Sequence, residues 1–393
     1  MSAHSSLPAA SHLVADSYLP HRLDNVVKQT AQVFVIGTGR CGSTLLSNML
    51  RLHPQMLSLS ELFSFVSDLG CAIGDAFPEG LVSGTQLWAI LAAQLPRQNL
   101  MLKHDVAMPE VLYRWQDASS RFNAQTGVPA ISQVCLPHLS DAPDTLFEQL
   151  QALVCSLPPA PVGVQYQRVF AWLAEQQGAP VWIERSGGGL RIVARLMQHF
   201  PNARFIHIVR NGSETALSMS KHLGFRFVFG AFQLLEVLGI DPYVNPDRRW
   251  EGDLSDEQAS LLPERFSKQA FLDFSTPPPL CGHYWSGEIC HGLKILQALP
   301  AKRLMTIRYE DILQQTRLSA QQLLDFIRQP LATPANEELR ATDAQWLQQV
   351  QALVRAPQAH WQTLSDKLRQ QTMHACAPGM AALAHAGFIY PEI

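Results

Sequence analysis

The stretch from Gln32 to Leu50 constrains the fold of this 393-residue chain more than any other part of it. It begins with a continuous apolar run, Val33 to Ile36, which is typical of a strand buried on both faces, as in a parallel sheet. From Ser43 onward, leucines and a methionine recur at helical spacing. Between the two, the chain is interrupted by Gly37, Gly39 and Gly42. A strand, a glycine turn and a helix together point backbone N–H groups at an anion, so the sequence predicts a phosphate- or sulfate-binding loop.

Three kinds of anion-binding loop fit this stretch, besides an ordinary strand–helix turn. The glycine spacing satisfies the dinucleotide fingerprint, with Glu61 as the acid for the ribose, which would make the protein an NAD-dependent oxidoreductase. The spacing also approaches the ATP-binding Walker loop, but Ser43 stands where that loop needs its lysine. In the third interpretation Arg40, inside the loop, is the cation beside the anion. We favour the interpretation with Arg40 as the cation, and we rank the Walker loop last.

A second anion-binding element is predicted around residue 210. The buried strand Phe205 to Val209 delivers Arg210 at its carboxyl end, where open α/β sheets bind their ligands. Ser218 lies two turns into the helix that follows, and a guanidinium and a hydroxyl placed in this way can converge on one phosphate. A solvent-facing serine beside a structural arginine is the alternative.

The remaining pattern predicts an α/β fold, with a P-loop-like parallel sheet flanked by helices. Further strands are expected near residues 56–59, 181–183 and 303–307, with mainly helices after them. We divide the chain into an N-terminal arm, residues 1–30, and one domain, residues 31–393. Within that domain, residues 62–178 form a helical insertion. Residues 223–285, rich in aromatic residues and prolines, form an insertion or lid on the acceptor side of the active site.

Several motifs in the same order resemble those of the sulfotransferases that use 3′-phosphoadenosine-5′-phosphosulfate (PAPS), and are closest to the tyrosylprotein and carbohydrate branch. The resemblance covers roughly residues 32–65, 180–222 and 300–313. It is carried by Arg40-Cys-Gly-Ser-Thr-Leu-Leu46, Trp182-Ile-Glu-Arg-Ser186, His207-Ile-Val-Arg-Asn-Gly-Ser-Glu-Thr-Ala-Leu-Ser218 and Arg308-Tyr-Glu-Asp-Ile312.

This resemblance implies a transferase that moves the sulfuryl group of PAPS to an acceptor by in-line displacement. The implied 3′-phosphate site is Arg210 and Ser218, assisted by Tyr309. The implied 5′-phosphosulfate site comprises Arg40, Cys41, Gly42, Ser43 and Thr44.

The same resemblance implies three catalytic residues. Glu61 would be the general base, and Arg40 and Arg185 would be the cations that stabilise the leaving oxygen. Arg185 stands where the family has a lysine, and Gly187 replaces the proline that usually follows two residues later.

Two observations leave alternatives to Glu61 as the base: Glu61 also fits a structural role, and a histidine is a second candidate. Ser58-Leu-Ser-Glu61 fits a helix capping box, which would make Glu61 a structural residue. His104 is the second candidate base, because an imidazole exchanges protons near neutral pH.

No metal is expected, because the departing group is already a stabilised phosphate. The cluster that could ligate one has no standard zinc spacing; its members are Cys281, His283, Cys290 and His291.

Composition narrows the classes of partner. A net charge of −3 and a pI near 6.5 make nucleic acid an unexpected partner. The seven cysteines are scattered without a Cys-x-x-Cys pair, which favours a reducing compartment. The sequence shows neither a signal peptide nor a membrane-spanning run, so we expect a cytoplasmic protein without a membrane partner. We expect a small, partly apolar acceptor such as a natural product, sulfated on a hydroxyl or on an amine or amide nitrogen.

Overall fold

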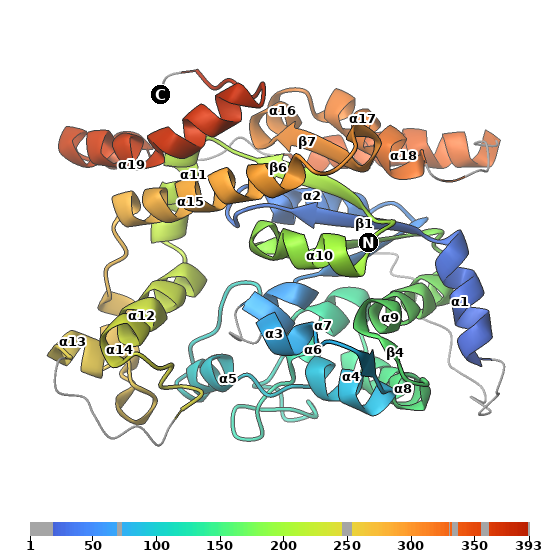
Figure 1. Cartoon of the computed structure of the whole chain (residues 1–393), viewed down its shortest axis with the longest axis horizontal. Coiled ribbons are helices and arrows are strands. Elements are labelled where there is room, and N and C mark those ends of the chain that lie inside the picture. Colours follow the sequence, from blue (N-terminus) through green and yellow to red (C-terminus); the bar gives the residue numbers. More distant parts are fainter. Residues whose placement is uncertain are drawn as a thin grey trace.

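The computed structural model describes residues 19–68, 73–245, 254–329, 331, 337–354 and 361–391; residues 1–18 of the expected N-terminal arm lie outside this range. The centre is a parallel five-stranded sheet in the order β2-β5-β1-β6-β7, which confirms the predicted α/β class (Figure 1). Its strands are β1 (Ala31–Ile36), β2 (Met56–Ser60), β5 (Val181–Arg185), β6 (Arg204–Val209) and β7 (Leu304–Arg308).

Helices bury both faces of the sheet, as continuous apolar strands require. Val33 and Val35 of β1 pack with α2 (Ser43–Arg51), α17 (Thr316–Arg328) and α18 (Glu337–Leu353). Phe34 and Ile36 face the opposite way, into the larger core. The helices on that side include α9 (Val162–Gln176), α10 (Val193–His199) and α15 (Pro278–Leu296). Alternate residues of one strand therefore belong to two different cores.

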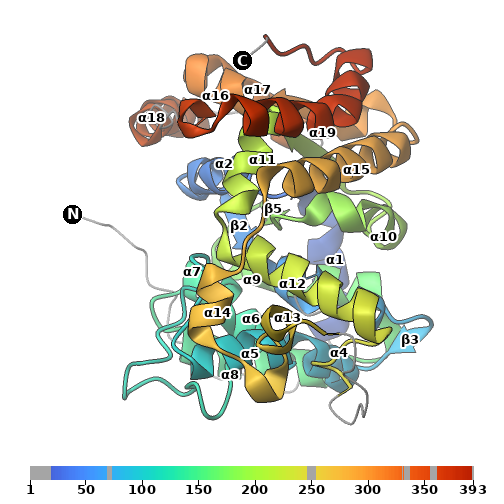
Figure 2. The same cartoon turned by 90° about the vertical axis from the view of Figure 1, so that its left-hand side faces the viewer.

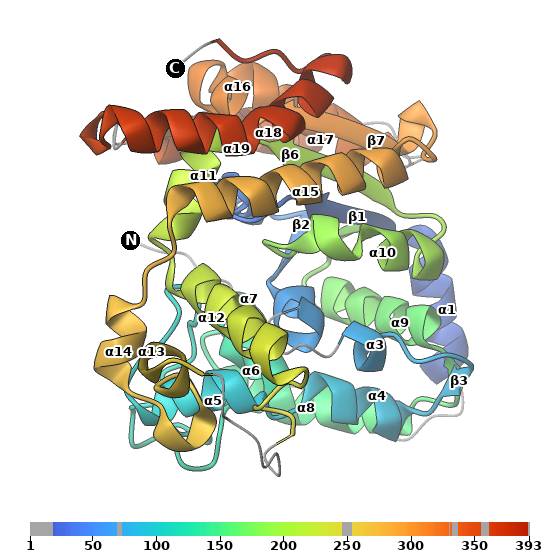
Figure 3. The same ribbon diagram turned by 60° about the vertical axis from the view of Figure 1, so that its left-hand side comes forward.

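Two segments form the part of the molecule below the sheet in Figures 1 and 3. The first connects β2 to β5 and is mainly helical. Its elements are η1 (Ser64–Asp68), α3 (Ile73–Ala76), β3 (Leu81–Val82), α4 (Gly84–Leu91), α5 (Pro96–Lys103), α6 (Ala130–Gln133), α7 (Cys135–Leu139), α8 (Pro143–Ser156), β4 (Ala160–Pro161) and α9; β3 and β4 pair antiparallel.

The second segment follows α11 (Gly212–Ser220) and carries most of the aromatic residues noted in the sequence. It contains α12 (Leu223–Leu238), α13 (Asp256–Ala259), η3 (Pro263–Arg265) and α14 (Lys268–Asp273). Because prolines at positions 278 and 279 open α15 at its first turn, Tyr284 and Trp285 belong to a long helix that packs against α11. The segment therefore ends near residue 277 rather than at 285.

The remaining elements are α1 (Leu19–Gln29), which packs on α9, and η2 (Gly189–Ile192), η4 (Ala301–Arg303), α16 (Tyr309–Gln314), η5 (Trp361–Thr363) and α19 (Asp366–His385). Helix α19 runs along α15, as Figure 2 shows. In the described part of the chain, none of the helices has the length and apolarity needed to cross a bilayer.

The strand order brings the sequence motifs to one place. The carboxyl ends of parallel strands lie along one edge, and here each of the five is followed by, or ends in, a residue singled out from the sequence. β1 leads into the glycine loop, and the other four present Glu61, Arg185, Arg210 and Tyr309. β5 separates β1 from β2, whereas dinucleotide-binding folds pair their first two strands.

Candidate active site

The loop between β1 and α2 has the backbone of an anion-binding turn. Gly39, Arg40 and Gly42 all have positive φ, at 79°, 56° and 93°. Arg40 is strained in this region, because a side chain disfavours left-handed backbone. Gly42 is the N-cap of α2 and provides no side-chain hydrogen bond, so its cap leaves the first N–H groups of the helix for a ligand.

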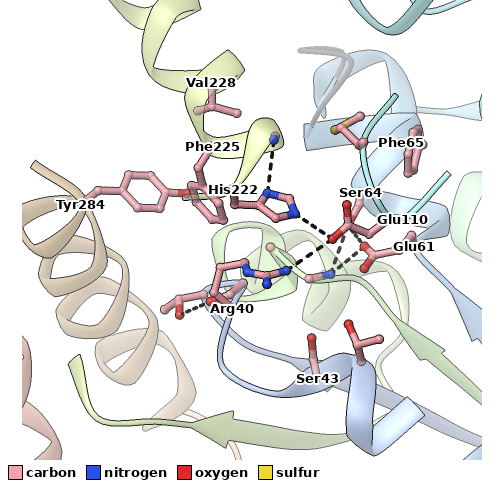
Figure 4. Close-up of a pocket in the computed structure, with 17 residues that line it drawn as sticks. Arg40, Ser43, Glu61, Ser64, Phe65, Glu110, His222, Phe225, Val228 and Tyr284 are labelled. Carbon is pink, nitrogen blue, oxygen red and sulfur yellow. Dashed lines mark hydrogen bonds and ion pairs between the residues drawn. The ribbon is translucent and has the colours of Figure 1, made fainter. Parts of the chain in front are cut away.

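The residues after Arg40 present different groups. The Cys41 side chain is 1% exposed and lies beneath the loop, where a Cβ on Gly37 would come within 2.5 Å of its Sγ. Because this side chain is buried, only the backbone of Cys41 is available to an anion, and the same burial raises the pKa of its thiol. Ser43 and Thr44 line the cavity next to the loop, and Figure 4 shows Ser43 at its floor.

The second predicted anion-binding element meets this loop. Arg40 Nε donates to Ser218 Oγ at 3.2 Å, and Arg210 Nη1 donates to the Arg40 carbonyl oxygen at 3.3 Å. The Arg210 guanidinium also lies over the ring of Tyr309, 4.9 Å from its centroid. Tyr309 in turn fills the space beside Gly42. Residues that are far apart in the sequence therefore converge on one face of the loop.

Glu61 stands directly after β2 and is 6% exposed, with φ at 55°. Its carboxylate accepts hydrogen bonds from Arg185, from the Ser64 hydroxyl and, at 2.9 Å, from the backbone N–H of Gly187. The capping-box interpretation is wrong, because Ser58 lies inside β2 and its hydroxyl bonds Ser47. Glu61 lines the cavity, beside Gly187 and the glycine loop.

Arg185 does not face the cavity, although it is expected from the sequence to be a cation at the leaving oxygen. Its side chain is 4% exposed and lies behind Glu61, with Nη2 donating to Ser60 Oγ at 2.7 Å. Arg185 is absent from the described lining of the cavity. A guanidinium in this position fixes the Glu61 carboxylate instead of facing a reacting group.

Two residues of the cavity were not predicted from the sequence, Glu110 and His222. Glu110 Oε1 lies 2.9 Å from His222 Nε2 and 3.4 Å from Arg40 Nη1. His222 caps α12, and its Nδ1 accepts the Gly224 N–H at 3.2 Å, so Nε2 carries the proton that bonds Glu110. Burial raises the pKa of Glu110, but His222 and Arg40 outweigh it and hold that pKa below its usual range.

An apolar wall completes the cavity. In Figure 4 Phe225 and Tyr284 lie on one side of Arg40, and the carboxylates of Glu61 and Glu110 lie on the other. Phe225 rests on the loop itself, since a Cβ on Gly39 would come within 3.0 Å of its ring. Further apolar lining comes from Phe65, Met108 and Val228. A ligand that approaches the glycine loop from this side meets apolar surface.

Two other sequence candidates lie away from the cavity. His104, the second candidate base, ends α5 and packs against the Phe266 ring, 4.9 Å between centroids, and it is not among the described residues that line the cavity. The four cysteine and histidine candidates for a metal are spread around α15, with Cys281 buried and Cys290 exposed. Within the described residues, no three possible metal ligands gather at one point.

The fold and the loop thus define an α/β protein of the P-loop-like class, with two predicted anion-binding elements beside a buried carboxylate. The chain matches the model of the sulfotransferase family over residues 32–279 and that of the sulfotransferase domain over residues 192–372. Because the first match spans more than half of the chain, the protein belongs to the sulfotransferase family.

Solved structures with similar chains carry the same description. A sulfotransferase domain from the curacin biosynthetic pathway is 16% identical, with 92% of this chain and 99% of that chain covered and a TM-score of 0.41. A sulfotransferase from Mycobacterium avium is 14% identical, with 95% and 82% covered and a TM-score of 0.41. A sulfotransferase domain from the Synechococcus PCC 7002 olefin synthase is 16% identical, with 93% and 96% covered and a TM-score of 0.37. A comparison with curated protein sequences gave no significant match.

Nothing in the site or in the family match supports the oxidoreductase alternative. That alternative assigns Glu61 to the ribose of a dinucleotide, but both family models that match this chain are those of sulfotransferases. The order of the strands also differs from that of a dinucleotide-binding fold.

Proposed function

We propose that this enzyme transfers the sulfuryl group of PAPS to a hydroxyl, or to an amine or amide nitrogen, of a small and largely apolar acceptor. The observation that carries the proposal is the convergence of Arg40, Arg210 and Ser218 beside the buried Glu61 carboxylate. Cationic groups and uncapped backbone N–H groups in such a cluster fit a ligand with two separated anionic groups.

Each part of the site has a role in this proposal. The loop from Arg40 to Thr44 holds the 5′-phosphosulfate, with Cys41 and Gly42 contributing backbone N–H groups. Arg210 and Ser218 hold the 3′-phosphate, and Tyr309 supports both through its contacts with Gly42 and Arg210. PAPS supplies the sulfuryl group on a phosphate leaving group, and Arg40 stabilises the charge that develops there.

Glu61 takes the proton of the acceptor. It lines the cavity from beside the loop, and a carboxylate oxygen has two acceptor sites, so a substrate hydroxyl can still bond to it. Arg185 and the Gly187 N–H orient that carboxylate. Arg185 is therefore a positioning residue in this proposal rather than the second catalytic cation expected from the sequence.

The base is tested with Glu61→Gln. We expect sulfate transfer from PAPS to a panel of phenols and alcohols to fall by about a hundredfold or more, because a general base contributes roughly that factor. Calorimetric affinity for 3′-phosphoadenosine-5′-phosphate should stay within about twofold. Glu148→Gln, at an exposed ion pair with Arg121, is the matched control. Full turnover in Glu61→Gln would remove Glu61 from the mechanism.

The donor site is tested with Arg210→Ala. Loss of a charge-assisted contact should weaken 3′-phosphoadenosine-5′-phosphate binding by about ten- to a hundredfold. Binding of AMP, which lacks the 3′-phosphate, should change little. Equal losses for both ligands would place the 3′-phosphate elsewhere. A thermal-shift comparison that includes NAD separates this donor site from a dinucleotide site.

A further inference from the structure

The Glu110 carboxylate faces the cavity and is held only at one oxygen by the described side chains. Its side chain is 22% exposed, and both side-chain contacts, from His222 Nε2 and from Arg40 Nη1, go to Oε1. The contact with Arg40 is long, at 3.4 Å, which makes it the weaker of the two. No described side chain contacts Oε2, so the carboxylate can still accept a hydrogen bond from a ligand in the cavity.

Binding of the donor alters the charge around Glu110. The proposed function needs the Arg40 guanidinium at the phosphosulfate, and that guanidinium is the cation paired with Glu110 in this structure. The Glu61 charge is balanced by Arg185, whereas Glu110 would keep only His222. A partly buried carboxylate without a cation is costly, so the cavity then favours a ligand that brings a positive charge.

The wall opposite Glu110 has matching chemistry. The rings of Phe225 and Tyr284 meet edge to face, 5.9 Å between centroids, and both line the cavity. Aromatic faces attract ammonium groups, and a carboxylate beside them adds hydrogen bonds and charge. The aliphatic lining of Met108 and Val228 suits an uncharged carbon skeleton.

We infer that the acceptor is an amino alcohol or aminophenol, with an apolar body and a protonated amine that Glu110 recognises after the donor has bound. The inference rests on the proposed function, because it assigns the acceptor side of the same site. Glu61 takes the proton of the reacting hydroxyl, and Glu110 takes no part in proton transfer.

Two phenols that differ only in the amine provide the test: tyramine and para-ethylphenol. With PAPS as the donor, we expect kcat/KM for tyramine to exceed that for para-ethylphenol by about tenfold or more. Glu110→Gln should lower kcat/KM for tyramine by about tenfold more than it lowers kcat/KM for para-ethylphenol. Glu148→Gln, the same change at an exposed ion pair, should alter neither.

A binding measurement keeps this inference separate from the proposed activity. Calorimetry should show tyramine binding to the complex with 3′-phosphoadenosine-5′-phosphate, weaker binding without the nucleotide, and weaker binding to the Glu110→Gln complex. If that pattern holds but neither phenol is sulfated, the proposed activity fails and the amine site stands. Equal affinity for both phenols, or equal loss of both reactions in Glu110→Gln, overturns the inference.

Discussion

At the scale of single residues, the backbone N–H of Gly187 helps to hold the Glu61 carboxylate. The family resemblance leads one to expect a proline at position 187, yet a proline has no backbone N–H and could not make the 2.9 Å bond to Glu61. The glycine thus allows the protein backbone to help orient the carboxylate, together with Arg185.

Glu184, on the strand that leads to this pair, should give the protein a pH-dependent stability. It is 1% exposed, and burial, with the nearby negative charge of Glu61, raises the pKa of Glu184 to about 8. At pH values between the ordinary glutamate pKa, about 4.3, and the raised pKa of about 8, Glu184 holds a proton in the native state and loses it in the unfolded state. Stability should therefore fall as the pH rises through this window, by on the order of a few kcal/mol.

Glu184→Gln should remove this contribution, because a neutral amide oxygen can still accept the Ser186 hydroxyl, which donates at 2.6 Å. Urea denaturation of both proteins at pH 5 and pH 8 measures the free energy of unfolding. From pH 5 to pH 8, this free energy should fall less in the variant than in the wild type. A difference between the two proteins that is the same at both pH values would show that Glu184 titrates normally.

At the scale of elements, the glycine loop depends on a helix that is remote in the sequence. A Cβ on Gly42 would lie 2.1 Å from Cδ2 of Tyr309, the first residue of α16, and Tyr309 packs under Arg210. The tight backbone of the loop and the position of Arg210 are thereby linked. Phe225 of α12 makes a similar contact at Gly39.

Gly42→Ala should consequently disturb both anion-binding elements at once. We expect binding of 3′-phosphoadenosine-5′-phosphate to weaken by about tenfold or more, since Tyr309 must move and the left-handed backbone costs about 1–2 kcal/mol. Gly178→Ala is the matched control, because Gly178 has a φ of 63° but nothing within 4 Å of an added Cβ. If both variants lose stability to the same extent and bind the nucleotide equally well, Tyr309 does not support the loop.

At the scale of the whole molecule, the cavity is shared by the sheet edge and the two segments beneath it. The sheet edge supplies the glycine loop and Glu61, the segment between β2 and β5 supplies Glu110, and the segment after α11 supplies His222 and Phe225. The two segments are joined by the ion pair between Arg97 and Asp241, whose side chains are 8% and 16% exposed. Their relative position sets the shape of the acceptor side.

Arg97→Ala should loosen this junction. Removing one member of a largely buried ion pair costs about 3–5 kcal/mol, and Arg97 also lies over the rings of Phe227 and Tyr243. Hydrogen exchange should rise in α12 and α14 more than in the sheet. Arg121→Ala, at an exposed ion pair with Glu148, should cost less than about 1 kcal/mol. Uniform exchange across the protein in Arg97→Ala would argue against a separate junction.

The sequence by itself determined the sheet and the glycine loop, and it singled out Arg210 and Ser218, whose convergence on one phosphate stays a prediction. These features are local: an apolar run, a glycine spacing and an arginine at a strand end carry their own signals. Only the tertiary structure decided that Glu110 and His222 meet across 112 positions and that Arg185 lies behind Glu61. Such contacts depend on how separate segments pack, and packing across long sequence separations leaves no periodic pattern in the chain.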